Sequence, residues 1–210
     1  MPNQYENLSS KMKVAFANGR YDEALKLAKN IIQFNSAQTE PYIIAGDVYL
    51  LQNQYDKAEV NYKNAIQLDS NNGEYHFFLG NVYFGTGDFT KAIEYYAKAE
   101  SLGCSDDIKQ KIYYIMGNLN QISGNNEEAL LNYKKAGEIK GSNQEREDIL
   151  LNQIEIYVNE GHYDQAEIAA RSLKMISPDV FDYYHLLFQI LLQRHKFNEA
   201  KEVLEEAKSY

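Results

Sequence analysis

The chain has 210 residues, 44% of them apolar, with one cysteine and a formal net charge of −9 at pH 7. The single cysteine, Cys104, excludes an internal disulfide, and so acidic a chain lacks the basic face with which nucleic-acid binders displace phosphate counterions. No stretch approaches the apolar run of a membrane span, and the first residues lack the basic start and apolar core of a signal peptide. We therefore expect a cytoplasmic protein with no nucleic-acid partner and no membrane insertion.

One pattern recurs along the chain: an apolar stripe at helical spacing, a turn, and a second stripe with the same period. In its clearest copy the first stripe includes Leu79 and Tyr83, the turn contains Gly87, and the second stripe includes Ala92 and Tyr96. A helix–turn–helix of this kind cannot bury its apolar face alone, so it needs neighbouring copies. Numbered from repeat position 1, the copies begin at Tyr5, Thr39, Gly73, Gln110, Glu147 and Phe181.

The copies keep a common register, since their starts are 34, 34, 37, 37 and 34 residues apart and position 20 is alanine in all six. Where position 8 is glycine, position 24 is tyrosine, and where position 8 is Met12 or Ile154, position 24 is alanine. This exchange predicts that the two positions share one space in the core. The pair Phe188–Leu204 departs from the rule, so the last copy should pack differently. The glycine–tyrosine pairs are Gly46–Tyr62, Gly80–Tyr96 and Gly117–Tyr133.

The pattern closely resembles the tetratricopeptide repeat, whose large-x₂-Leu-Gly-x₂-Tyr and Ala-x₃-Phe signature the chain follows from residue 5 to residue 210. The resemblance implies an all-α fold, a right-handed α-solenoid of helix–turn–helix repeats, forming a single domain over residues 1–210. Six repeats are predicted at residues 5–38, 39–72, 73–109, 110–146, 147–180 and 181–210.

Capping residues indicate where helices start. Position 18 is a good N-cap residue in five copies, which predicts the start of the second helices there; these residues are Asp22, Asp56, Thr90, Asp164 and Asn198. Ser177 and Pro178 predict the start of the last helix pair. The longer 37-residue spacings carry capping signals at Ser105 and Ser142. We expect one extra N-terminal turn on the first helices of repeats four and five, from near Asp106 and Asn143; the alternative is longer loops.

Candidates for catalysis are lacking. The four histidines show no metal-ligand spacing, and no nucleophile, phosphate-binding or dinucleotide motif is present. His76 occupies a core position, where a structural histidine is the expected interpretation. We therefore expect no enzymatic activity, no cofactor and no metal.

The resemblance implies a binding site on the first helices, whose positions 2, 5, 9 and 12 line a concave surface in the family. Apolar groups framed by side-chain amides are typical of an interaction site, and asparagines can bond the backbone of an extended peptide. The alternative is that position 5 side chains are buried between neighbouring first helices. The predicted groove, centred on repeats two to four, comprises Ile43, Asp47, Leu50, Phe77, Asn81, Phe84, Tyr114 and Asn118.

The predicted function is a non-catalytic scaffold that binds an extended peptide or protein segment. A neutral to basic partner is favoured by the acidic chain. Phe77 and Tyr114 stand where carboxylate-clamp members of the family have lysine, which argues against binding of acidic chaperone tails. Two alternatives remain: a regulatory or assembly segment of a larger enzyme or secretion complex, and a self-associating structural scaffold. The polar last helix favours a monomer.

Overall fold

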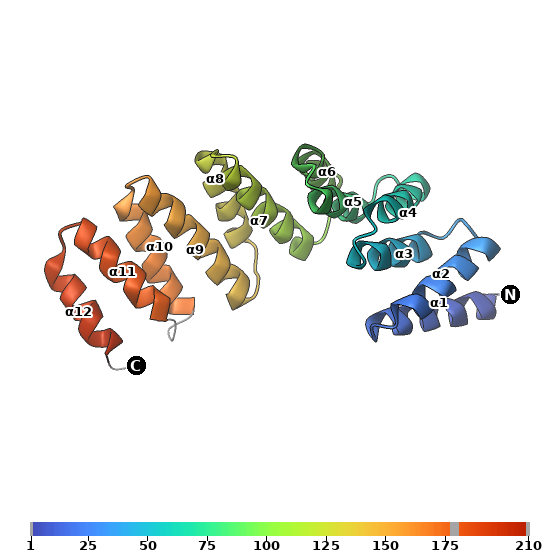
Figure 1. Ribbon diagram of the computed structural model, residues 1–210, viewed down its shortest axis with the longest axis horizontal. Coiled ribbons are helices and arrows are strands. Elements are labelled where there is room, and N and C mark those ends of the chain that lie inside the picture. Colours follow the sequence, from blue (N-terminus) through green and yellow to red (C-terminus); the bar gives the residue numbers. More distant parts are fainter. Residues whose placement is uncertain (1, 177–180, 209–210) are drawn as a thin grey trace. The chain divides into compact units, whose positions relative to one another are not determined.

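The computed structural model describes residues 2–176 and 181–208, with side chains over 5–176 and 183–208, and this part of the chain forms α-helices without strands (Figure 1). Within 2–176, and again between α11 and α12, consecutive helices join through short turns, as the all-α prediction requires. Their bounds are α1 (Pro2–Ala17), α2 (Tyr21–Phe34), α3 (Thr39–Leu51), α4 (Tyr55–Leu68), α5 (Gly73–Thr86), α6 (Phe89–Leu102), α7 (Asp106–Ile122), α8 (Asn126–Glu138), α9 (Asn143–Asn159), α10 (Tyr163–Ile176), α11 (Phe181–Gln193) and α12 (Phe197–Ala207).

Two compact units divide the chain, residues 1–108 and 109–210. In the first unit each of the helices α1 to α6 packs against the next, and α1 also contacts α3. In the second unit the same serial packing joins α8 to α12. Each predicted repeat supplies a first and a second helix, so the odd-numbered helices are first helices and the even-numbered ones are second helices. The predicted start at Ser177 and Pro178 lies outside the described residues.

The turn inside each repeat has one recurring backbone geometry. Position 15 has a positive φ, which disfavours residues with a Cβ and suits glycine. In the third repeat Gly87 has φ 80°, and the amide of Asp88 donates to the carbonyl of Tyr83 at 2.9 Å, which closes α5. The position 15 residues are Gly19, Asn53, Gly87, Gly124, Gly161 and His195.

The predicted caps of the second helices are wrong by two residues, because these helices begin at position 17 and their N-cap is position 16. In α6 the N-cap is Asp88, whose carboxylate accepts a hydrogen bond from the Lys91 amide at 3.2 Å. Asp22 and Asp56 lie in the first turn instead, where their charge complements the helix dipole. The left-handed residue at position 15 sets this start, since the chain enters the helix directly after it.

The exchange between positions 8 and 24 is confirmed in the core. A Cβ on Gly46 would lie 2.6 Å from the Tyr62 ring, and a Cβ on Gly80 would lie 2.7 Å from the Tyr96 ring. Tyr62, Tyr96 and Tyr133 are fully buried, as are the alanines at position 20. In the last repeat Leu204 is 43% exposed, so that repeat packs differently, as predicted.

The extra turns on the fourth and fifth first helices are also confirmed. α7 and α9 each have 17 residues and begin at Asp106 and Asn143, whereas α3, α5 and α11 have 13, 14 and 13. α1, with 16 residues, is the exception among the other first helices. Ser142 and Glu145 form the predicted capping box, in which each side chain bonds the other residue's amide.

Candidate functional site

The predicted groove residues divide between the two units. Ile43, Asp47 and Leu50 lie on α3 and are half-buried, while Phe77 on α5 is only 7% exposed. Its ring packs against Tyr96, with centroids 5.8 Å apart, which is the buried alternative for position 5. Asn81 is half-buried and Phe84 is 41% exposed on the same helix. In the second unit Tyr114 and Asn118 lie half-buried on α7.

Position 9 on three first helices is bonded to the position 24 tyrosine of its own repeat. The Tyr62 hydroxyl donates to Asp47 Oδ1 at 2.6 Å, and the Tyr96 hydroxyl donates to Asn81 Oδ1 at 2.8 Å. Burial raises the pKa of the Asp47 carboxyl, and the hydrogen bond from Tyr62 opposes that rise. Each tyrosine therefore fixes its partner's side chain, and each bonded asparagine keeps its amide N–H groups as donors.

In the second unit this bond belongs to a larger polar network. The Tyr133 hydroxyl lies 2.6 Å from Asn118 Oδ1 and 2.7 Å from Gln121 Oε1. From the next first helix, Asn152 Nδ2 donates to Asn118 Oδ1 at 3.1 Å. Gln121 Nε2 in turn donates to Glu155 Oε2 at 3.1 Å. These bonds tie α7 to α9. Asn118 and Glu155 are at position 9 and Gln121 is at position 12, both predicted surface positions, whereas Asn152 is at position 6.

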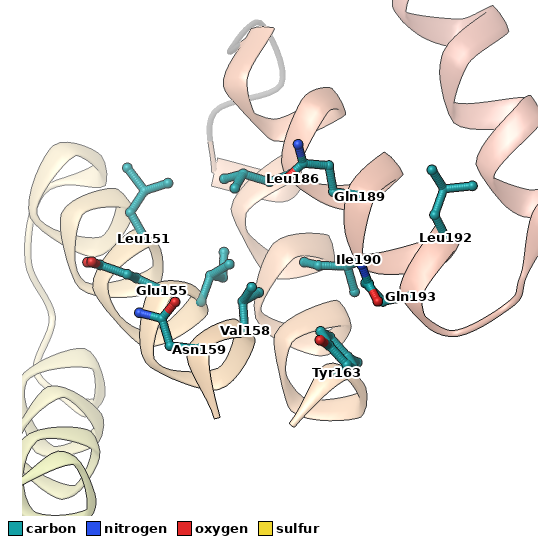
Figure 2. Close-up of a pocket in the computed structure, with 11 residues that line it drawn as sticks. Leu151, Glu155, Val158, Asn159, Tyr163, Leu186, Gln189, Ile190, Leu192 and Gln193 are labelled. Carbon is teal, nitrogen blue, oxygen red and sulfur yellow. The ribbon is translucent and has the colours of Figure 1, made fainter. Parts of the chain in front are cut away.

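A cavity of about 560 Å³ opens between α9 and α11 in the second unit. Figure 2 shows Leu151 and Glu155 on α9 at one side and Leu186 and Gln189 on α11 at the other. Its apolar lining comprises Leu151, Ile154, Val158, Leu186, Ile190 and Leu192. Its polar lining comprises Glu155, Asn159, Tyr163, Gln189 and Gln193. Apolar walls with a few polar groups at the edge are the usual composition of a binding cavity.

Glu155 is the only charged residue among the described side chains that line this cavity. Its carboxylate is exposed, accepts a bond from the neutral Gln121 amide, and forms no ion pair with a described lysine or arginine. The repeat that contains it has Ala170 at position 24, so no tyrosine hydroxyl bonds Glu155 as it does Asp47. The cavity therefore has an anionic edge.

The two cations in the turn after α11 are engaged by carboxylates of α10. Arg194 pairs with Asp164 and Glu167, and Lys196 contacts Glu167 at 3.1 Å. Glu167 is 5% exposed. Burial acts to raise the pKa of Glu167, but hydrogen bonds from Arg171, Lys196 and Arg194 outweigh it and lower that pKa. This network fixes the turn between α11 and α12 to α10, and Glu155 takes no part in it.

His76 has the structural role expected of it. The ring is 1% exposed, stacks on Tyr95 with centroids 6.1 Å apart, and places Nε2 3.3 Å from the Ser70 carbonyl oxygen. Nδ1 has no hydrogen-bond partner among the described residues. Burial lowers the pKa of His76, and the bond to Ser70 opposes that effect.

Among the described residues, no three His, Cys, Asp or Glu side chains are grouped so as to hold a metal ion. Within 2–176 and 181–208, no helix combines the length and apolar content that crossing a bilayer requires.

The cavity contains residues that sequence reasoning recognised and residues that it missed. Leu151, Glu155, Val158, Gln189 and Leu192 occupy the expected surface positions 5, 9 and 12, but the predicted site was centred on other repeats. The missed residues lie at positions the family pattern does not assign to the groove, and they are Ile154, Asn159, Tyr163, Leu186, Ile190 and Gln193. The loss of tyrosine at position 24 in repeat five was the available signal that the groove changes there.

Comparison with protein families gives matches over the middle of the chain. A family model described as TPR repeat matches residues 46–87, and one described as tetratricopeptide repeat matches residues 73–103. No curated protein matches the chain.

Solved structures share the fold at low sequence identity. YrrB, whose structure is described as a TPR protein with an unusual peptide-binding site, is 21% identical, with 86% of this chain and 90% of that chain covered and a TM-score of 0.67. The C-terminal part of a TPR repeat-containing protein from Cytophaga hutchinsonii is 16% identical, covering 95% and 77%, with a TM-score of 0.76. Pseudomonas aeruginosa pilF is 11% identical, covering 98% and 89%, also with a TM-score of 0.76.

Proposed function

Because the chain is a tetratricopeptide-repeat protein, we propose that it is a non-catalytic scaffold that binds an extended protein segment along its first helices. We call the side chains at positions 2, 5, 9 and 12 of these helices the first-helix face. Such a face suits an extended segment because side-chain amides can satisfy the backbone groups that an extended peptide leaves unpaired.

The cavity between α9 and α11 is the observation that carries this proposal. The cavity is open and mostly apolar, and five of its eleven lining residues occupy positions 5, 9 and 12, where the family pattern expects the ligand. A partner that covers the apolar side chains removes them from water, which favours binding. Leu192 at its edge is 38% exposed, so part of this apolar surface is available to a partner.

The first unit contributes to the same proposal through a narrower set of residues than the sequence predicted. Phe84 is exposed, and Asp47 and Asn81 are half-buried with defined hydrogen bonds. Phe77 is buried and belongs to the packing. A neutral to basic partner and a monomeric chain remain predictions, the second of which light scattering at several protein concentrations tests.

Selection from a random peptide display library tests the function. Synthetic copies of the selected peptides are titrated by fluorescence anisotropy against the wild type, Leu192→Ser and Leu131→Ser. Leu131 is the matched control, because it is 55% exposed on the second helix α8 and does not line the cavity. We expect Leu192→Ser to weaken binding by about 1 kcal/mol or more and Leu131→Ser to leave it unchanged.

Two results would contradict the proposal. One is a selection that yields no peptide with measurable affinity. The other is a set of peptides whose binding is weakened by Leu131→Ser and insensitive to Leu192→Ser, because binding would then use the second helices.

A further inference from the structure

We propose that the cavity between α9 and α11 accepts an aliphatic or aromatic side chain of the partner and that Glu155 binds a lysine or arginine next to that side chain. The ligand class is therefore a cationic segment with an apolar anchor. This inference rests on the proposed function and specifies the chemistry of its site.

The anchor follows from the walls of the cavity. The volume of about 560 Å³ is bounded by Leu151, Val158 and Ile190, together with other aliphatic side chains. Pockets of about 300–1,000 Å³ with such walls enclose compact apolar groups well. A polar or charged side chain inserted there would lose its water without recovering hydrogen bonds from the walls.

The cation follows from the charge at the edge. Glu155 is exposed and lies on the lining between Leu151 and Val158, so a residue adjacent to the anchor can reach it. Arg194 and Lys196, the cations in the turn after α11, are already paired with Asp164 and Glu167. The edge therefore attracts a cation and disfavours a carboxylate.

The amide side chains that border the cavity indicate that the bound segment is extended. Asn159 on α9 and Gln189 and Gln193 on α11 border the cavity, and each amide offers both a donor and an acceptor. Gln189 Nε2 lies 2.9 Å from His185 Nε2, so its side chain is partly oriented before a partner arrives. Because both α9 and α11 carry such amides, the main chain of a segment that crosses from one helix to the other can form hydrogen bonds with both.

Positional-scanning peptide libraries on a solid support test the inference. Each library fixes one residue as Leu, Phe, Ser or Asp and its neighbour as Lys, Gln or Glu, and contains an equal mixture of residues elsewhere. Capture of the purified full chain is measured for the wild type, Glu155→Lys and the control Glu128→Lys. Glu128 is an exposed acid on the first turn of α8 and does not line the cavity.

We expect the wild type and Glu128→Lys to prefer libraries that pair Leu or Phe with Lys. The preference for Lys over Glu should be about two- to fivefold, the range of an exposed ion pair, and Glu155→Lys should reverse it. A preference for Ser or Asp at the anchor, or a Lys preference unchanged by Glu155→Lys, would overturn the inference and leave the scaffold function standing. Failure of every library, together with failure of display selection, would overturn both. A concentration-dependent dimer lost in Leu192→Ser would show that the cavity's occupant is a second copy, which also overturns the inference.

Discussion

At the scale of single residues, repeats two to four share one arrangement of a glycine, a polar side chain and a tyrosine. The glycine at position 8 makes room for the tyrosine ring, and the tyrosine hydroxyl bonds the polar side chain that follows the glycine. Tyrosine and polar partner are always 15 residues apart. Packing of the helix pair and orientation of the first-helix face therefore depend on the same ring.

Gly80→Ala tests whether the tyrosine ring needs the space that the glycine leaves. The new Cβ would lie 2.7 Å from the Tyr96 ring, so we expect a loss of about 1–3 kcal/mol in the free energy of unfolding. Gly137→Ala is the matched control, because its nearest neighbour would be 3.9 Å away, and alanine in a helix is favoured over glycine by about 0.5–1 kcal/mol. Urea unfolding followed by circular dichroism measures both. Equal effects of the two substitutions would contradict the packing account.

Phe77→Ala tests whether position 5 is a packing position in repeat three. Phe77 is 7% exposed, so truncation should cost about 3–5 kcal/mol of stability. Phe84→Ala on the same helix removes a ring that is 41% exposed and should cost about 0.5 kcal/mol or less. Chemical denaturation measures the free energy of unfolding of both variants. A Phe77→Ala protein as stable as the wild type would show that Phe77 is not a packing residue and would support its predicted place on the binding surface.

His76 makes stability depend on pH. Burial lowers the pKa of the folded-state ring below its ordinary value, so the folded protein favours the neutral form and the unfolded chain binds the proton more readily. Stability is therefore complete above the unfolded pKa of about 6.5 and is lost as pH falls through the folded pKa. Urea midpoints measured between about pH 7.5 and pH 5.5 should fall less in His76→Gln than in the wild type. Identical pH slopes would show that His76 does not titrate in this range.

At the scale of elements, the start of α9 depends on one serine. Ser142→Ala removes the side-chain acceptor for the Glu145 amide and should destabilise the chain by about 1 kcal/mol. Ser142→Gly serves as the comparison, since glycine at an N-cap costs only a few tenths of a kcal/mol, about 0.3. Thermal unfolding of the pair measures the difference, and a Ser142→Ala midpoint equal to that of the wild type would refute a capping role.

Most elements could be predicted from the sequence, because each depends on local signals. The apolar stripes and turns of each repeat were sufficient for the helix pairs, and the capping signals at Ser105 and Ser142 located the longer α7 and α9. The second-helix starts were misplaced, since acids such as Asp22 serve equally well at an N-cap and in a first turn. Only the left-handed backbone at position 15 distinguishes these possibilities.

The candidate site was less predictable than the elements. Whether Phe77 is buried depends on how it meets Tyr96, and the cavity depends on the separation of α9 and α11. Neither the Phe77–Tyr96 contact nor the separation of α9 and α11 can be read from the repeat pattern. The same repeat position is buried in one repeat, as at Phe77, and lines the cavity in another, as at Leu151. The substitution of Ala170 for tyrosine was the one local sign that the face differs in repeat five.

At the scale of the whole molecule, the chain repeats one kind of first helix, and the proposed function requires that part of the first-helix face be open to a partner. Both units are built from the same helix pairs, and the cavity lies entirely in the second. The position 9 side chains of repeats two to four are hydrogen-bonded to the tyrosines of their own repeats, whereas Glu155 is exposed at the cavity edge. We therefore place the principal contact of a partner on α9 and α11.

Hydrogen–deuterium exchange with and without a saturating display-selected peptide tests this placement most directly. A bound partner slows local opening of the helices that it contacts. We expect slower amide exchange over 151–158 and 186–192, on the first helices that line the cavity, with little change in α8 or α12. Protection confined to α8, α10 and α12, with none over α9 and α11, would contradict it.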